Sequence, residues 1–365
     1  MAVPGHIPGH GGQLHALARE FSLSSASLID FSASISPYPL PQHVLESVAR
    51  AISDPDLLRL YPDSENLALR TAVAAYLAVE ENTILVANGV MPLVTAALQA
   101  IGSGRCMVVK PSFGGYETAL RIAGAESVGF ALSAEQEFRL HPPALIEAAI
   151  TQRCGAILIA NPHSPSGQTI SRSTMLELCG RALDAGIAML IDEAFIDFVP
   201  RESVANIVPT WKNCVVFRSP TKFLSIPALR VAYAVADSEL ACRIDRYIHE
   251  WPVSTLAALA CAELLSCGEH HAMVRERTAS ERRFMLERLR EVGIRVFPSQ
   301  ANFLLMQAAN AVEGEHLWRS LIVDHRIVLR SCANFIGLDA GYLRFGLRLR
   351  EENEKLLQVL AQEKR

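Results

Sequence analysis

The stretch AILIANPHSPSGQTISRSTMLELCGRALDAGIAMLIDE, residues 156–193, contains the pattern of two strands and one helix. It opens with the short apolar run Ala156–Ala160, and a second run, Ala188–Ile191, lies near its end. Between them, residues 173–185 carry apolar side chains at the spacing of an amphipathic helix. Two buried strands joined by a helix form a βαβ unit, in which the strands are parallel.

The same alternation extends from this unit in both directions. Further short apolar runs, which predict strands, lie at 84–87, 106–110, 215–217 and 231–235. Helix patterns separate several of them, at 66–79, 92–101 and 116–123. Strands that alternate with helices predict an α/β fold with a large doubly wound, mostly parallel sheet covered on both faces.

The pattern changes after Trp251-Pro252. A long charged helix over 268–292, four short strands and a terminal helix over 351–362 predict a smaller C-terminal α/β domain. The first thirty residues are irregular and rich in Gly and Pro. We therefore expect an N-terminal arm (1–40), a large domain (41–255) and a small domain (256–365).

Composition limits the kind of protein. The 365 residues are 50% hydrophobic and 20% charged, which excludes a disordered chain. The net charge of −4 does not indicate a basic surface that would bind nucleic acid. No apolar run reaches the roughly 18 residues of a membrane span. The eight cysteines form no CxxC pair, and the N-terminus lacks a signal-peptide pattern. We expect reduced thiols, a cytoplasmic location and no metal site.

A polar segment, RSPTK at 218–222, follows the apolar run 215–217, and Arg230 comes eight residues after Lys222. The lysine amine can form an imine with a carbonyl compound. The hydroxyls of Ser219 and Thr221 and the Arg230 guanidinium can hold a phosphate. Alone this pattern is weak, because a lysine after a strand is usually a solvated loop residue.

Other strand ends carry residues of matching chemistry. Asp192 and Asn161 each follow an apolar run, and Gly89-Val90 precede Pro92 at a predicted helix start, where backbone amides bind anions. Ligands of such sheets bind at the carboxyl ends of the strands, so these groups are expected to converge. They match what pyridoxal phosphate requires: an imine-forming lysine, a pyridine partner, a ring-hydroxyl partner and a phosphate cup. The alternative is a set of unrelated turns on a generic sheet.

Over nearly its whole length the chain resembles the fold-type I pyridoxal-phosphate enzymes of the class I and II aminotransferase superfamily. The resemblance implies Lys222 as the Schiff-base lysine, Asp192 as the partner of the pyridine nitrogen and Asn161 as the partner of the ring hydroxyl. It also implies a set of further cofactor contacts, with Phe113 stacked on the ring and Gly89, Val90, Ser219, Thr221 and Arg230 at the phosphate.

Two more elements of this family have counterparts here. RLYPD at 59–63 resembles an element whose tyrosine, here Tyr61, reaches the cofactor phosphate of the neighbouring subunit, so a homodimer is expected. YLRFG at 342–346 places Arg344 where the family binds the α-carboxylate of the substrate.

Within the superfamily the chain is most similar to the branch of histidinol-phosphate aminotransferases and L-threonine-O-3-phosphate decarboxylases. HGG at 10–12 and RSCANFIGLD at 330–339 resemble decarboxylase segments, and Phe195 stands where most aminotransferases carry a tyrosine. This implies decarboxylation of L-threonine O-3-phosphate to (R)-1-amino-2-propanol O-2-phosphate, a step of cobalamin side-chain biosynthesis. Arg330 and His10 are the implied contacts of the substrate phosphate. The alternative is a histidinol-phosphate-type or other class I and II aminotransferase.

The chain departs from the family pattern in several places. The usual NPNNPTG is NPHSPSG at 161–167, and Val90-Met91 leaves only backbone amides for the phosphate at that loop. A catalytically inactive protein of this fold is disfavoured by the intact set of Lys222, Asp192 and Arg230. A nucleotide-binding protein is disfavoured because neither GxGxxG nor GxxxxGK[ST] follows a predicted strand.

Overall fold

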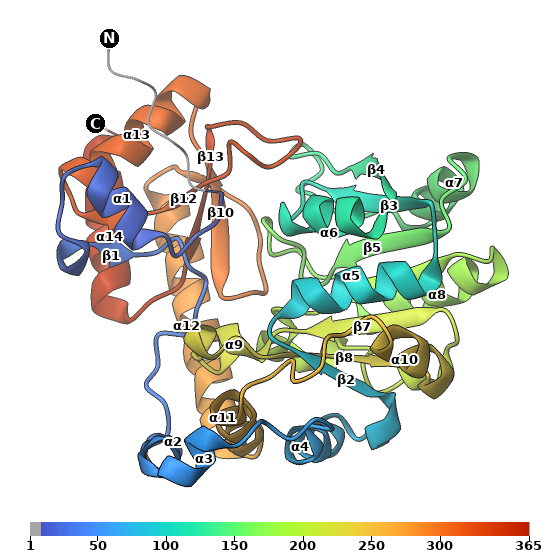
Figure 1. Ribbon diagram of the computed structural model, residues 1–365. Coiled ribbons are helices and arrows are strands. Elements are labelled where there is room, and N and C mark those ends of the chain that lie inside the picture. The colour runs from blue at the N-terminus through green and yellow to red at the C-terminus, as the bar shows by residue number, and fades with distance from the viewer. Residues whose placement is uncertain (1–8, 365) are drawn as a thin grey trace.

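The structure is a computed structural model and describes residues 9–364. Its largest element is a seven-stranded sheet in which β8 is antiparallel to β2 and β7, while the other neighbouring strands are parallel (Figure 1). In spatial order the strands are β2 (Ile84–Ala87), β8 (Ala232–Ala236), β7 (Cys214–Arg218), β6 (Ala188–Asp192), β5 (Ala156–Ala160), β3 (Arg105–Lys110) and β4 (Glu126–Ala131). The expected α/β fold with a large, mostly parallel sheet is confirmed.

Helices cover both faces of this sheet. Successive side chains of a strand point to opposite faces, so Leu158 of β5 joins one hydrophobic core while Ile157 and Ile159 join the other. The first core includes residues of α5 (Val90–Ile101), α6 (Gly115–Ala123) and α10 (Ser238–Asp245). The second includes residues of α4 (Leu67–Leu77), α7 (Pro142–Thr151), α8 (Arg172–Asp184) and α11 (Thr255–Leu265). Burial on both faces explains why these strands are continuous apolar runs.

Capping side chains fix where several of these helices begin. The side chain of Ser171 accepts a hydrogen bond from the Thr174 amide at the start of α8, and Ser254 does the same for the Ala257 amide at α11. Each cap satisfies a backbone donor that the helix itself leaves unpaired, which is worth about 1 kcal/mol. The cap of α8 also ends the loop that follows β5, one of the loops around the cavity described below.

The C-terminal part of the chain forms a smaller α/β domain. Its antiparallel sheet runs in the order β12 (Arg330–Ser331), β13 (Tyr342–Gly346), β10 (Phe303–Gln307) and β9 (Arg295–Val296). The helices of this part are α12 (Gly268–Glu291), α13 (Ala311–Val323) and α14 (Arg350–Glu363). Their apolar faces enclose a separate hydrophobic core that includes Leu304 and Phe345 of the sheet.

Part of the expected N-terminal arm joins the core of this small domain. In Figure 1, α1 (Leu14–Glu20) and β1 (Ile29–Asp30) lie beside α14, and β1 pairs in parallel with β11 (Ile327–Val328). Leu17 and Phe31 are buried in that core. The next helices, α2 (Gln42–Ser53) and α3 (Pro55–Arg59), lie near α11 of the large domain. The core of the small domain therefore covers Phe31 within a single chain.

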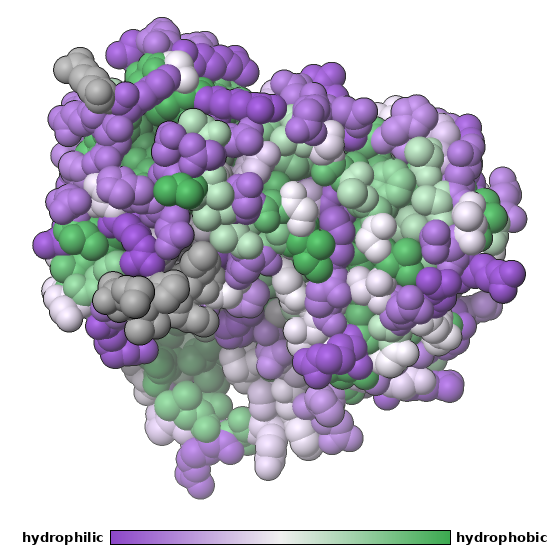
Figure 2. Space-filling model, turned by 90° about the horizontal axis from the view of Figure 1, so that it is seen from above, coloured by the Kyte–Doolittle hydropathy of each residue, from purple (hydrophilic) through white to green (hydrophobic). Residues whose placement is uncertain are grey.

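Within residues 9–364, no helix combines the length and the apolar character needed to cross a membrane. On the face shown in Figure 2, hydrophilic and hydrophobic residues are interspersed. Scattered exposed apolar side chains of this kind are normal on a folded protein.

Candidate active site

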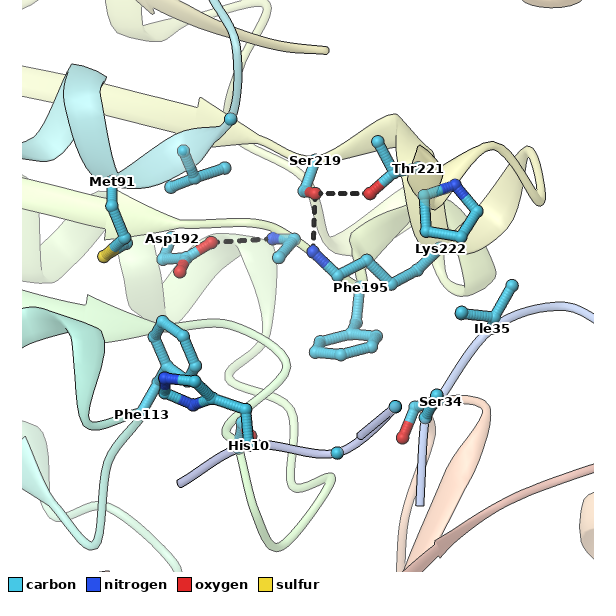
Figure 3. Close-up of a pocket in the computed structure, with 18 of the residues that line it drawn as sticks. His10, Ser34, Ile35, Met91, Phe113, Asp192, Phe195, Ser219, Thr221 and Lys222 are labelled. Carbon is cyan, nitrogen blue, oxygen red and sulfur yellow. Dashed lines mark hydrogen bonds between the residues drawn. The ribbon is translucent and has the colours of Figure 1, made fainter. Parts of the chain in front are cut away.

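A cavity of about 700 Å³ lies at the carboxyl ends of the parallel strands, where the large domain meets the N-terminal segment and β13 (Figure 3). Most residues that the sequence predicts for the site line this cavity. They are His10, Gly89, Val90, Phe113, Asp192, Ser219, Thr221, Lys222, Arg230 and Arg344. Strand ends that are far apart in the sequence thus bring one set of polar groups together, as expected for a doubly wound sheet.

Lys222 lies in the short helix α9 (Pro220–Phe223), directly after β7. Its Nζ donates a hydrogen bond of 2.6 Å to Ser219 Oγ, which is 3.0 Å from Thr221 Oγ1 (Figure 3). Burial lowers the pKa of Lys222 to about 8, since the charged amine is poorly solvated there. The Asp192 carboxylate raises this pKa, while Arg230 and Arg344 lower it further. The amine is therefore much more easily neutral, and so nucleophilic, than an ordinary lysine.

Asp192 is the last residue of β6, and its carboxylate accepts two hydrogen bonds. The Ala194 amide donates to Oδ1 at 2.9 Å, and the Tyr116 hydroxyl donates to Oδ2 at 2.6 Å. Burial raises the pKa of Asp192, whereas the Tyr116 hydrogen bond, the Lys222 charge and the Ala194 amide lower it. A cation placed against this carboxylate would compensate the burial of its charge.

Gly89 and Arg230 form a cradle at the start of α5. Gly89 has a φ of 133°, and a Cβ on it would lie 3.0 Å from Arg230 Nη2, so a larger residue would intrude on the guanidinium. Arg230 Nη1 is held by a hydrogen bond of 3.0 Å to the Pro227 carbonyl. The amino-terminal amides of α5 and the Ser219 and Thr221 hydroxyls complete a set of donors suited to a phosphate.

The N-terminal segment closes one side of the cavity. The His10 ring lies 5.0 Å from the Phe113 ring, centroid to centroid. A Cβ on Gly11 would clash with the Ser32 carbonyl, and the Gly12 amide donates a hydrogen bond of 2.9 Å to Ser32 Oγ. The two glycines therefore let the chain pass close to Ser32 and hold His10 over the cavity.

Arg344 enters the cavity from β13 of the small domain. Its Nη1 donates to Ser164 Oγ at 3.0 Å, and its guanidinium lies 5.1 Å from the centre of the Phe303 ring. Arg344 Nε is buried and has no hydrogen-bond partner within the described part of the chain. Ser164, one of the departures from the family motif, thus contacts the arginine expected to bind a carboxylate.

Three residues expected in the site do not line the cavity. Asn161 is fully buried, and its side chain bonds both the carbonyl and the amide of Ile170, at 3.0 and 2.9 Å. Tyr61 is 78% exposed and stacks on Trp251 with the ring centroids 4.7 Å apart. Arg330 is buried, and its guanidinium donates to the Gly9 and Ser331 carbonyls and to Asn334 Oδ1. Its contact with Gly9 links it to the segment that carries His10.

Other residues of the cavity were not expected from the sequence, among them Tyr116, Asn88, Asp30 and Ser32. Asn88 directly follows β2, so the strand-end rule could have identified it. Tyr116 lies inside a helix pattern, where a tyrosine is usually a core residue. Asp30 and Ser32 lie in the segment expected to be an arm, and no local signal connects them to the strand ends.

The arrangement fits pyridoxal phosphate on observations of this structure. A lysine with a lowered pKa lies among hydroxyls, a buried carboxylate lines the same cavity, and a glycine leaves room beside a fixed arginine. When bound, pyridoxal phosphate supplies an electron sink for a bond broken at the α-carbon of an amino acid. Lys222 would carry the cofactor, Asp192 would face its pyridine nitrogen and the cradle would hold its phosphate.

Comparison with known proteins identifies the family. The family described as aminotransferase class I and II matches residues 26–360. A threonine-phosphate decarboxylase of Salmonella typhimurium is 32% identical over 357 residues, which cover 96% of this chain and 95% of that protein. The histidinol-phosphate aminotransferase structure from Clostridium acetobutylicum has a TM-score of 0.84 at 27% identity and covers 92% of this chain and 99% of its own.

A histidinol-phosphate aminotransferase from Sinorhizobium meliloti, solved in complex with pyridoxal 5'-phosphate, has the same fold. Its TM-score is 0.83 at 18% identity, with 100% of this chain and 95% of that chain covered. The strand-end chemistry, the cradle and the family match all agree. The chain therefore belongs to the class I and II aminotransferase family, and its cofactor is pyridoxal 5'-phosphate.

Proposed function

We propose that this enzyme decarboxylates L-threonine O-3-phosphate to (R)-1-amino-2-propanol O-2-phosphate, a step of cobalamin side-chain biosynthesis. The observation that carries the proposal is the contact between the two decarboxylase-like segments. Arg330 Nη2 donates to the Gly9 carbonyl and to Asn334 Oδ1, both at 2.7 Å, so residues 330–334 and the segment of His10 meet beside the cavity. The identity of 32% to a threonine-phosphate decarboxylase supports the same reaction.

The residues of the chain have separable roles in this reaction. Arg344 and Arg330 determine how the substrate lies, because the Arg344 guanidinium lines the cavity, where it can bind the α-carboxylate, and Arg330 holds the segment that carries His10. Which bond to the α-carbon breaks depends on that orientation. Lys222, with a pKa of about 8, can give a proton to the α-carbon after the carboxylate has left. Asp192 would hold a proton on the pyridine nitrogen of the bound cofactor.

A second candidate is a histidinol-phosphate-type aminotransferase. The observation in its favour is the structural similarity to the histidinol-phosphate aminotransferase from Clostridium acetobutylicum, with a TM-score of 0.84. In that reaction the α-proton leaves instead of the carboxylate, and an oxo-acid is needed to complete the cycle.

Mass analysis of the products tests the two candidates directly. The purified holoenzyme is incubated with L-threonine O-3-phosphate, with and without an added oxo-acid. We expect a phosphorylated amine that has lost carbon dioxide, in both reactions and at the same rate. A product that forms only with the oxo-acid, or a much faster reaction of histidinol phosphate with an oxo-acid, would instead establish the aminotransferase.

Arg330→Lys is expected to raise the KM for L-threonine O-3-phosphate, with a loss of roughly 1.5–3 kcal/mol, because it loosens the segment that carries His10, the expected contact of the substrate phosphate. The planar guanidinium bonds Gly9 and Asn334 at once, and the ammonium of a lysine is a single point charge. Any slow reaction of unphosphorylated threonine should barely change. Arg319→Lys, on the outer side of α13, is the matched control. Equal losses with both substrates would contradict a role of Arg330 at the phosphate.

We further propose that the enzyme is a cytoplasmic homodimer with Tyr61 shared across the interface. Tyr61 and Trp251 are 78% and 43% exposed, and they form a stacked pair of the kind that gains from burial against a partner. Trp251 also has a φ of 50°, an unusual conformation for a bulky residue. Sedimentation should give twice the mass of the chain. A fully active monomer would exclude the shared site.

A further inference from the structure

Tyr116 contacts both side chains that the cofactor ring is expected to meet. Its hydroxyl donates a hydrogen bond of 2.6 Å to Asp192 Oδ2. Its ring packs edge-to-face against Phe113, with the centroids 5.8 Å apart and an interplanar angle of 83°. Tyr116 is only 2% exposed, and all three residues line the cavity. It comes from α6, whereas Asp192 ends β6, so the contact ties a helix to a strand end.

The Tyr116 hydroxyl can act only as a donor to this carboxylate. Burial and the neighbouring Asp192 charge raise the pKa of Tyr116 well above its ordinary value, so the phenol keeps its proton. Since the Ala194 amide occupies Oδ1, the two donors together fix the rotation of the carboxyl group. One edge of the carboxylate is thereby left to face the cavity.

We propose that Tyr116 is a positioning residue, whose hydroxyl orients Asp192 toward the pyridine nitrogen and whose ring supports Phe113 above the cofactor ring. The inference rests on the cofactor roles proposed for Asp192 and Phe113, and it holds for either candidate reaction. Tyr116 acts through Asp192 and Phe113 and not on the reacting bond.

The hydrogen bond from Tyr116 has a definite electrostatic consequence. It stabilises the ionised carboxylate, so a proton between Asp192 and the pyridine nitrogen stays on the nitrogen. The charged group that faces Asp192 is Lys222 from α9, and Arg230 and Arg344 lie near Lys222. Glu193 points away and pairs with Arg218. Without the phenol the carboxylate becomes more basic, and the nitrogen loses positive charge.

The test is a pH titration of the visible absorbance of the bound cofactor in Tyr116→Phe. The phenylalanine keeps the ring contact with Phe113 and removes only the donor. Because a less positive pyridine raises the pKa of the nitrogen that links Lys222 to the cofactor, we expect the absorbance midpoint to rise by about one pH unit. The kcat should fall about tenfold. Tyr116→Leu, which also removes the ring, should in addition weaken cofactor binding.

Tyr76→Phe provides a matched control. Tyr76 is another tyrosine that donates to an aspartate, Asp197 Oδ1 at 2.8 Å, but neither residue lines the cavity. Its removal should leave the absorbance midpoint unchanged. An unchanged midpoint in Tyr116→Phe, or the same shift in Tyr76→Phe, would overturn the inference. A shift found in an enzyme that transaminates would support the role of Tyr116 while contradicting the proposed decarboxylation.

Discussion

Lys222→Ala is expected to abolish both turnover and the covalent attachment of the cofactor, with the fold retained. Within residues 9–364, Lys222 is the one lysine that lines the cavity. A pKa of about 8 leaves roughly one amine in ten neutral at pH 7, against about one in three thousand for an ordinary lysine. That difference gives Lys222 a useful concentration of the nucleophilic, neutral amine at neutral pH. Borohydride reduction followed by peptide mass analysis should find the cofactor on residue 222 in the parent protein only.

Two further variants control this experiment. Lys222→Arg keeps the positive charge beside Asp192 but cannot form the bond, so it should be as inactive as the alanine variant. Lys110→Met removes a second buried lysine. Lys110 also lies at the end of a strand, β3, but it pairs with Glu117 and does not line the cavity. This variant should retain the reducible bond. A labelled peptide around residue 222 is thus expected only where Lys222 is present, and an active Lys222→Ala protein would contradict the assignment.

The strand ends were predictable because burial on both faces makes each central strand a continuous apolar run. β5 and β6 were found in this way, and the residues that follow them were placed at one edge of the sheet. β4 (Glu126–Ala131) was missed because, as an edge strand, none of its six residues is buried. The helix α13 (Ala311–Val323) was also missed, because charged residues separate its few apolar residues and obscure the helical spacing.

What the sequence could not provide is the direction of a side chain. Asn161 follows β5 as expected, yet its side chain bonds the Ile170 backbone. Arg330 was expected to contact the substrate phosphate, but its guanidinium turns to the Gly9 carbonyl, a contact across more than three hundred residues. Tyr116 was overlooked for the same reason, because only the folded chain brings its hydroxyl to Asp192. Long-range contacts of this kind have no local signal.

Asp192→Asn is expected to keep the bound cofactor but to lower kcat by about two to three orders of magnitude. A neutral amide has the shape of the carboxylate but cannot hold a proton on the pyridine nitrogen, and without that charge the ring accepts electrons poorly. Retained visible absorbance together with the lost turnover is the expected result. Turnover at the parent rate would remove Asp192 from the mechanism.

Although Asp192→Asn should lower kcat, it should not lower the stability of the cofactor-free protein. Burial raises the pKa of Asp192, so above that pKa the ionised carboxylate lowers the free energy of unfolding, and asparagine does not carry this penalty. The apo variant should therefore melt at or above the temperature of the parent at neutral pH. Glu193→Gln, the adjacent control, removes the carboxylate paired with Arg218 at 3.1 Å. Burial raises the pKa of Glu193 as well, so this variant should not lower the stability of the apo protein either, and the kcat of the folded enzyme should be kept. A fall in kcat in Asp192→Asn but not in Glu193→Gln, with neither apo protein less stable than the parent, would show that Asp192 is retained for catalysis.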